Sequence, residues 1–287
     1  MSAPSTKPIS DPPVSALVVQ GFSPQEDYGK IDVMRYLPLE RFLTLLEFEA
    51  MWFSRLGALQ DRFEATAPQG FRAKVIALDA LSMQDQELRN RLHAGPWPTM
   101  VAAAEHGRGD DGRKMFAVNC WFIGRMESEK MWKEYGAGGK GVAVCSTIQR
   151  LSTSFYIYGD YAKVSRVGRV EYVDFANHKL TRPHDILQVS FTKDKSFSDE
   201  QEARIVTLFS FHSGCLYSDG TQAGIPGSPV FLPHSKGFFI KCRLQQLIRC
   251  VIVGPNTLPD FRMLMKRILS RYGLTIDVEY SQIPSWL

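Results

Sequence analysis

Residues 191–211 read FTKDKSFSDEQEARIVTLFSF, a stretch that begins charged and becomes apolar. Side chains of a strand alternate between two faces, so one face that starts at Glu200 carries Glu200, Glu202 and Arg204. The same face turns apolar at Val206. A solvated face would stay polar along its length. The pattern therefore predicts a strand whose charged end lies at the base of a cleft, as an active site would.

Two carboxylates on one strand face, two residues apart, are separated by about 7 Å at roughly 3.3 Å per residue. At that separation Glu200 and Glu202 can take different proton roles, and Arg204 keeps at least one of them ionised. A charge ladder on an edge strand would use the same residues only to prevent aggregation. Both interpretations remain open from these residues alone.

The bulk properties describe an ordinary globular protein. The chain has 287 residues, of which 44% are hydrophobic and 11% aromatic, enough for one large domain or two small ones. Its 34 basic and 30 acidic residues are scattered and leave a net charge of +4. This charge pattern gives no reason to expect a nucleic-acid or anionic membrane partner.

The domain organisation is predicted as follows. Residues 1–28 are expected to be a flexible tail, because Pro and Ser dominate the first part of this segment. Residues 29–287 are expected to form a single α+β domain with a helical insertion at 79–112. The start of the chain lacks a signal-peptide pattern, and no stretch has the apolar length of a membrane span. We therefore expect a cytoplasmic protein.

The cysteines are odd in number and widely spaced. This spacing favours buried, reduced thiols over a disulfide framework or a zinc site. They are Cys120, Cys145, Cys215, Cys242 and Cys250.

The fold is predicted to be α+β, with a mixed, strongly twisted sheet and peripheral helices. Strands are expected at residues 31–36, 50–54, 115–122, 141–145, 167–173, 203–211, 247–253 and 274–280. Helices are expected at residues 39–48, 128–135 and 258–272, and in two pieces within 79–112. Pro38 suits the first turn of the first helix.

Familiar catalytic motifs are missing: the sequence has no phosphate-binding Gly loop, no GxSxG elbow and no metal-binding pair of histidines. The remaining candidates lie near strand ends or on a helix. Arg35 lies in an apolar strand and must find an anion there, either a structural carboxylate or a ligand phosphate. Ser54 ends the second strand. Tyr135 lies three residues after Trp132 on one predicted helical face.

Four stretches carry a resemblance to a known family. They are YLPLERFLTLLEFEAMWFSRLGALQDRFE (36–64), MWKEYGAGGKGVAV (131–144), FTKDKSFSDEQEARIV (191–206) and LIRCVIVGP (247–255). In this order they resemble a bacterial family described only as a domain of unknown function, with MWxxY...GV and ExExR motifs, and the resemblance spans about 31–255 apart from 79–112. The departures are Gln60 and Arg62, where Asn and Pro are usual, and Phe197, where Trp is common. The family implies no activity.

A second and weaker resemblance does imply one. Arg35, Ser54, Glu200 and Glu202 stand in the order found in ADP-ribosyltransferases of the Arg, Ser, Glu type. That resemblance implies a split sheet of the ADP-ribosyltransferase kind, with NAD as substrate rather than as a resident cofactor. The implied reaction cleaves NAD at the bond between nicotinamide and ribose and transfers ADP-ribose to a protein or nucleic-acid acceptor.

The resemblance also implies roles for the candidate residues. Glu202 would stabilise the oxocarbenium-like ribose, and Glu200 would take the proton of the acceptor. Arg35 would hold the pyrophosphate, and Ser54 would orient Glu202. The remaining candidates are Tyr36 or Tyr135 against the nicotinamide ring, and Arg204 beside Glu200.

Two other functions remain open. In a metal-dependent hydrolase or nuclease, Asp61, Glu64, Glu200 and Glu202 would bind a divalent ion, with Lys193 or Lys195 assisting. In a non-catalytic binding module the same pocket would hold a ligand without turnover.

Overall fold

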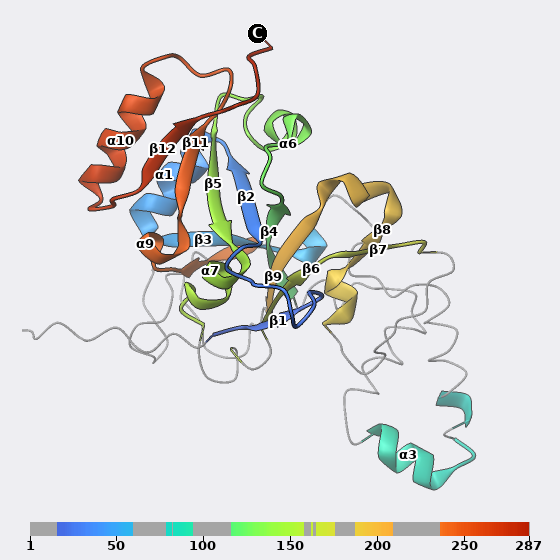
Figure 1. Cartoon of the computed structure of the whole chain (residues 1–287). Helices are drawn as coiled ribbons and strands as arrows, with labels where there is room; N and C mark the ends of the chain where they lie inside the picture. Colours follow the sequence, from blue (N-terminus) through green and yellow to red (C-terminus); the bar gives the residue numbers. More distant parts are fainter. Residues whose placement is uncertain are drawn as a thin grey trace, which may run out of the picture.

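The computed structural model describes residues 16–59, 79–81, 83–93, 116–157, 162, 165–175, 187–208 and 236–286 (Figure 1). It shows an α+β protein with a mixed, twisted, open sheet and helices on its periphery. Among the described helices, none combines the length and the apolar character needed to cross a membrane.

The strands and helices have the following bounds. The strands are β1 (Val18–Gln20), β2 (Asp32–Leu37), β3 (Ala50–Arg55), β4 (Phe116–Ile123), β5 (Val142–Thr147), β6 (Arg166–Arg169), β7 (Glu171–Val173), β8 (Thr192–Asp194), β9 (Glu202–Leu208), β10 (Gly237–Lys241), β11 (Cys250–Val253) and β12 (Asp277–Tyr280). The α-helices are α1 (Leu39–Phe48), α3 (Gln86–His93), α6 (Glu129–Glu134), α7 (Ile148–Thr153), α9 (Leu244–Leu247) and α10 (Phe261–Arg271). The short 3-10 helices are η1 (Leu56–Ala58), η2 (Gln188–Phe191) and η3 (Lys195–Glu200).

Ten of the described strands form one sheet. Eight of them follow the order β1-β6-β9-β4-β2-β5-β11-β12, and β3 with its partner β10 branches from β4. The two outer pairs, β1 with β6 and β11 with β12, are parallel, whereas the pairs between them are antiparallel. A separate two-stranded sheet is formed by β7 and β8.

The sheet forks at β4, because two strands share one of its edges. The carboxyl-terminal end of this edge pairs with β2 and the amino-terminal end pairs with β3, while β9 occupies the whole opposite edge. The register positions are Val33 with Ile123, Met34 with Phe122, Ser54 with Val118, and Arg55 with Ala117. Residues 119–121 therefore lie where neither β2 nor β3 reaches.

Side chains replace the missing strand in this fork. The Arg35 guanidinium donates to the Cys120 carbonyl oxygen at 2.8 Å, and the Asn119 amide donates to the Trp52 carbonyl oxygen at 2.9 Å. The Trp121 indole N–H in turn donates to the Asn119 side-chain oxygen at 2.6 Å. Buried backbone groups must find partners, and these bonds supply them for the Cys120 and Trp52 carbonyl oxygens where the sheet divides.

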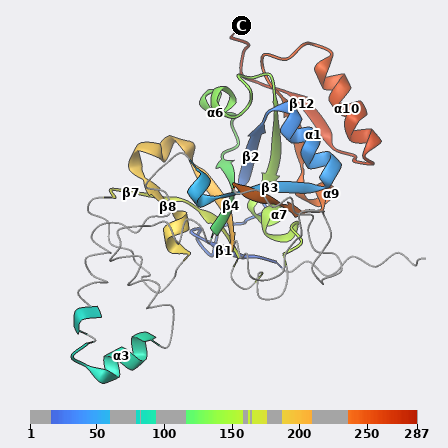
Figure 2. The same cartoon turned by 180° about the vertical axis from the view of Figure 1, so that it is seen from behind.

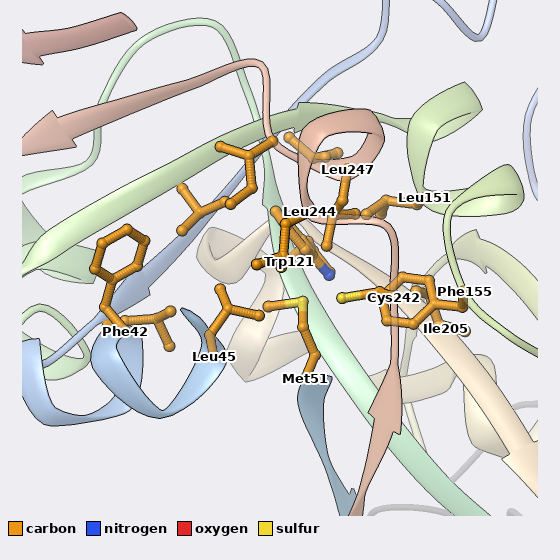
Figure 3. Packing of buried hydrophobic residues seen from close by; sticks show 14 of the residues in the cluster. Phe42, Leu45, Met51, Trp121, Leu151, Phe155, Ile205, Cys242, Leu244 and Leu247 are labelled. Carbon is orange, nitrogen blue, oxygen red and sulfur yellow. The ribbon is translucent and has the colours of Figure 1, made fainter. Parts of the chain in front are cut away.

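One face of the sheet carries the main hydrophobic core and is covered by α1, α7, α9 and α10 (Figures 1 and 2). Figure 3 shows Phe42 and Leu45 of α1 beside Met51, with Leu244, Leu247 and Leu151 closing the core from the other helices. The amphipathic sequence of α1 explains this packing, because its buried residues recur at helical spacing. Pro38 is the residue just before α1 and its carbonyl oxygen accepts from Phe42, so it precedes the first turn instead of lying in it.

The opposite face is covered by α6 and by the segment 187–200, and its apolar residues form two separate clusters. Tyr36, Phe122 and Trp132 belong to one cluster, under α6. Val206 and Phe191 belong to the other, under η2. Between the two clusters lie the buried charged residues of β8 and β9, Lys193, Glu202 and Arg204. These charged side chains separate the apolar clusters of this face.

Most predicted elements are confirmed, and two predicted ranges need correction. The tail predicted for 1–28 is wrong from residue 17 onward, because Leu17 is buried and β1 pairs with β6. The single strand predicted at 167–173 is two strands, because β6 pairs with β9 whereas β7 pairs with β8 in the separate sheet. The sequence did not predict β10 or α7. Within the predicted insertion, α3 is helical and lies away from the sheet in both views, and 94–112 is outside the described residues.

The fork makes Asn119 a test of the sheet's stability. Asn119→Ala removes the partners of the Trp52 carbonyl oxygen and the Trp121 indole N–H, and should lower the free energy of unfolding by about 2–4 kcal/mol. Denaturant unfolding followed by circular dichroism measures the change. The control is Thr44→Ala on the exposed side of α1, where a loss within about 0.5 kcal/mol is expected. Equal losses in the two variants would contradict the role of Asn119.

Candidate functional site

The candidate site is built where η3 passes into β9. Glu200 is the last residue of η3, Glu202 is the first residue of β9, and Gln201 between them adopts the left-handed conformation with φ 40° and ψ 54°. The predicted strand from Glu200 is therefore wrong in its first two residues. Even so, the turn at Gln201 brings both carboxylates to the same ammonium group, that of Lys193.

Lys193 lies at the centre of this cluster. Its Nζ is 2.6 Å from Oε2 of Glu200 and 3.6 Å from Oε2 of Glu202, and its side chain is buried. The Phe197 ring lies 4.7 Å from the same ammonium nitrogen. An aromatic face attracts a cation, so Phe197 supplies the contact that a Trp at this position would also make.

Glu202 is held from two further sides. Arg204 grips it with two parallel bonds, Nε to Oε1 at 2.6 Å and Nη2 to Oε2 at 2.8 Å, and also donates to the Ser190 carbonyl oxygen at 3.0 Å. The Tyr172 hydroxyl accepts from the Glu202 backbone N–H at 2.8 Å. Both charged partners are buried, and a bidentate pair of this kind fixes orientation as well as charge.

The two carboxylates differ in their affinity for protons. Burial raises the pKa of Glu200, and the hydrogen bond and charge of Lys193 only partly oppose this, so the pKa lies above its ordinary value. Burial opposes ionisation of Glu202 as well, but the charges and hydrogen bonds of Arg204, together with the charge of Lys193, bring its pKa below its ordinary value. Glu202 therefore stays ionised, while Glu200 is better placed to accept a proton.

Tyr135 lies at the solvent side of this cluster. It follows α6 directly and is 46% exposed. Burial of its hydroxyl, and then the negative charge of Glu200, raise the pKa of Tyr135 to about 12, so it stays protonated at neutral pH. Lys130 of α6 also forms an ion pair with Asp199, the residue before Glu200. These contacts hold α6 against η3 at the rim of the site.

Arg35 approaches the cluster through the fork in the sheet. Burial lowers the pKa of its guanidinium, while the Cys120 thiol and the charge of Glu202 oppose that shift. Its bond to the Cys120 carbonyl oxygen places it one strand away from Arg204, which is the register partner of Cys120. The structure thus brings together Arg35, Tyr135, Glu200, Glu202 and Arg204.

Two predicted site residues are not part of this cluster. Ser54 pairs with Val118, which is four residues along β4 from the partner of Glu202, a separation of about 13 Å along the strand. Its hydroxyl accepts from the Trp52 indole N–H at 2.9 Å, so Ser54 does not orient Glu202.

Tyr36 is buried and its hydroxyl accepts from the Ser128 backbone N–H at 2.9 Å. Its ring packs edge-on against Trp132, with ring centroids 4.9 Å apart. It therefore supports the start of α6 and is not available to stack on a ligand.

The sequence pattern does not predict Lys193 and Tyr172 at the transferase site. Lys193 enters the predictions only as an assisting residue of the metal-dependent hydrolase, and Tyr172 is not among the predicted residues. They are register partners in the short sheet of β7 and β8, and this pairing brings both to the start of β9. The alternation within VEYV and FTKD is too short to predict such a contact.

The metal-dependent alternative gains no support from the described part of the chain. There, no group of three or more His, Cys, Asp and Glu side chains is arranged to hold a metal ion. Glu200 and Glu202 are ion-paired with Lys193 and Arg204, whose positive charges oppose a further cation. Lys195 is paired with Asp174 instead. The proposed ligands Asp61 and Glu64 lie outside the described residues.

Comparisons with protein-family models, with curated proteins and with solved structures found no match for this chain. The resemblances to the bacterial domain family and to the ADP-ribosyltransferases therefore remain predictions from the sequence.

The pair of Glu202 and Arg204 can be tested by its effect on stability. Glu202→Gln leaves the buried Arg204 without its counter-charge and should cost about 3–5 kcal/mol at neutral pH. The control is Glu129→Gln, which breaks an exposed pair with Lys133 and should cost no more than about 1 kcal/mol. Denaturant unfolding measures both changes.

The same variant has a predicted pH dependence. Because the folded-state pKa of Glu202 is lowered, its contribution to stability is present above its unfolded-state pKa and is lost as the pH falls through the folded-state value. The difference between the wild type and Glu202→Gln should therefore shrink below about pH 4. A difference that grows in acid would contradict the lowered pKa.

Proposed function

We propose that this protein is an ADP-ribosyltransferase-like enzyme that binds NAD at the start of β9. In this proposal it cleaves the bond between nicotinamide and ribose and transfers ADP-ribose to a protein or nucleic-acid acceptor in the cytoplasm. The substrate chemistry comes from the resemblance of Arg35, Glu200 and Glu202, and the geometry of these residues supports it.

The observation that carries the proposal is the opposite shift of two neighbouring carboxyl pKa values. Glu200 and Glu202 contact one ammonium group, yet the pKa of Glu200 is raised and that of Glu202 is lowered. Neighbouring titratable groups with such separated pKa values are the usual arrangement for distinct acid-base roles. A structural charge ladder on a solvated edge strand does not need this difference, and β9 is flanked by β6 and β4.

The roles follow from this difference. Departure of nicotinamide leaves a cationic ribose, which a permanently ionised carboxylate stabilises, and this is the role of Glu202. Arg204 holds Glu202 in one orientation. Glu200 accepts the proton of the incoming acceptor. Tyr135 replaces Tyr36 as the aromatic side chain at the rim, and Ser54 has no role.

The charge of the cluster fits an anionic substrate group. Lys193, Arg204 and Arg35 are cationic and Glu200 and Glu202 are anionic, which leaves one positive charge at neutral pH. Excess positive charge in a partly buried site attracts phosphate groups. In this proposal the pyrophosphate of NAD lies on the Arg35 side of the cluster.

The proposal is tested with purified protein and NAD. Glu200→Gln keeps the size of the side chain and removes its basicity, so NAD-dependent ADP-ribose transfer should fall by about 10²–10⁴-fold while NAD binding persists. Nicotinamide release and labelling of added acceptors measure turnover, and calorimetry measures binding. The matched control is Glu171→Gln, an exposed residue of β7 outside the cluster, which should leave both unchanged.

Three outcomes would argue against the transferase. Equal turnover in Glu200→Gln and the wild type would remove Glu200 from the chemistry. Turnover abolished by a chelator would favour the metal-dependent hydrolase. Binding of NAD by the wild type without release of nicotinamide would favour the non-catalytic module.

A further inference from the structure

Two cysteines lie opposite each other in the sheet, away from the site just described. Cys145 of β5 and Cys250 of β11 are register partners in an antiparallel pair, and both thiols are free. Both belong to the apolar cluster on the face beneath α6. They are 105 residues apart in the sequence, which predicts only buried, reduced thiols, but the pairing of β5 with β11 makes them neighbours.

These two cysteines also line a cavity. It has a volume of about 360 Å³ and is bordered by Cys145, Cys250, Arg249 and Glu279, among others. A volume of this size is within the range of small-molecule sites. Cys250 is 8% exposed and Cys145 is 1% exposed, so Cys250 is the more accessible residue of the two.

The surroundings make Cys250 the more nucleophilic sulfur. A hydrogen bond from Cys145 lowers the pKa of Cys250, and the charge and hydrogen bond of Arg249 act in the same direction against burial and Glu279. The same hydrogen bond raises the pKa of Cys145, which keeps its proton. A thiolate next to a cation, with a second thiol in reach, is the arrangement of reactive cysteine pairs.

We propose that Cys145 and Cys250 form a dithiol site that reacts with a low-molecular-mass disulfide bound in this cavity. The Cys250 thiolate attacks one sulfur of the small disulfide, so a mixed disulfide forms as the original S–S bond breaks and one small thiol leaves. Cys145 then loses its proton and attacks the Cys250 sulfur, which releases the second small thiol. Two electrons pass from the pair to the small disulfide, and the two cysteine protons end on the two released thiols.

The backbone geometry permits this reaction. Directly opposed residues in an antiparallel pair have Cα atoms about 4.5–5.5 Å apart. A disulfide requires roughly 4.4–6.8 Å between Cα atoms, so β5 and β11 need little rearrangement to be linked. The other two described cysteines lie opposite other residue types in the sheet, Cys120 opposite Arg204 and Cys242 opposite Phe155.

The test uses the full-length, folded protein and oxidised glutathione. After incubation and quenching of free thiols, peptide mapping should find Cys145 linked to Cys250 in the wild type. Cys145→Ser removes the second step, so it should accumulate a glutathione adduct on Cys250. Arg249→Gln should slow the reaction of Cys250 by about tenfold, because the thiolate loses its neighbouring charge. Cys242→Ser is the control and should react like the wild type.

The wild-type result decides the matter even if a variant fails to fold. Failure of the wild type to form the link under native conditions would overturn the proposal, as would a link that appears only after denaturation. A glutathione adduct of Cys145→Ser on a cysteine other than Cys250 would overturn the assigned nucleophile. Nicotinamide release from NAD plays no part in this readout, so the result is independent of the transferase proposal.

Discussion

The central constraint on this fold is that two strands, β2 and β3, pair with the same edge of β4. Strands β2 and β3 pair with opposite ends of that edge. In the gap, Arg35 of β2 donates to the Cys120 carbonyl oxygen of β4, and Asn119 of β4 donates to the Trp52 carbonyl oxygen of β3. These side chains give partners to two carbonyl oxygens where the backbone pairing is interrupted. The fork also brings Arg35 close enough to Glu202 for the two charges to interact. A side chain that bonds the backbone therefore also supplies one of the charges of the candidate site.

The charged cluster lies on the other side of β4, where β9 pairs with its opposite edge. Strand β9 lies along the whole of β4, and Arg204 is opposite Cys120, whose carbonyl oxygen holds Arg35. Burying four charged groups is costly unless each has close partners. Here the four charged groups are ion-paired with one another: Lys193, Glu200, Glu202 and Arg204. As a result, the apolar residues of this face are divided into two clusters. This division places a polar site inside a sheet that is otherwise well packed.

The sequence predicted the central elements well, because their patterns are local. The range predicted for α1 matches the helix, since its apolar spacing and Pro38 are local signals. The same kind of local pattern predicted the strand that holds Glu202 and Arg204, but it wrongly extended that strand back to Glu200. Ser54 and Tyr36 were misplaced because chain order says nothing about register, and register puts Ser54 beside Val118. Cys250 owes its neighbour Cys145 to the pairing of β11 with β5, and Lys193 lies opposite Tyr172 through the pairing of β8 with β7. One sequence does not reveal such pairings.

The left-handed turn at Gln201 restricts which sequences can build this cluster. A side chain branched at Cβ is strongly disfavoured in that conformation, whereas Gly and Asn adopt it readily. The middle residue of the Glu-x-Glu stretch is therefore under steric selection although its side chain is exposed. In any protein that shares this architecture, Val or Ile at that place would signal that the two acidic groups no longer converge.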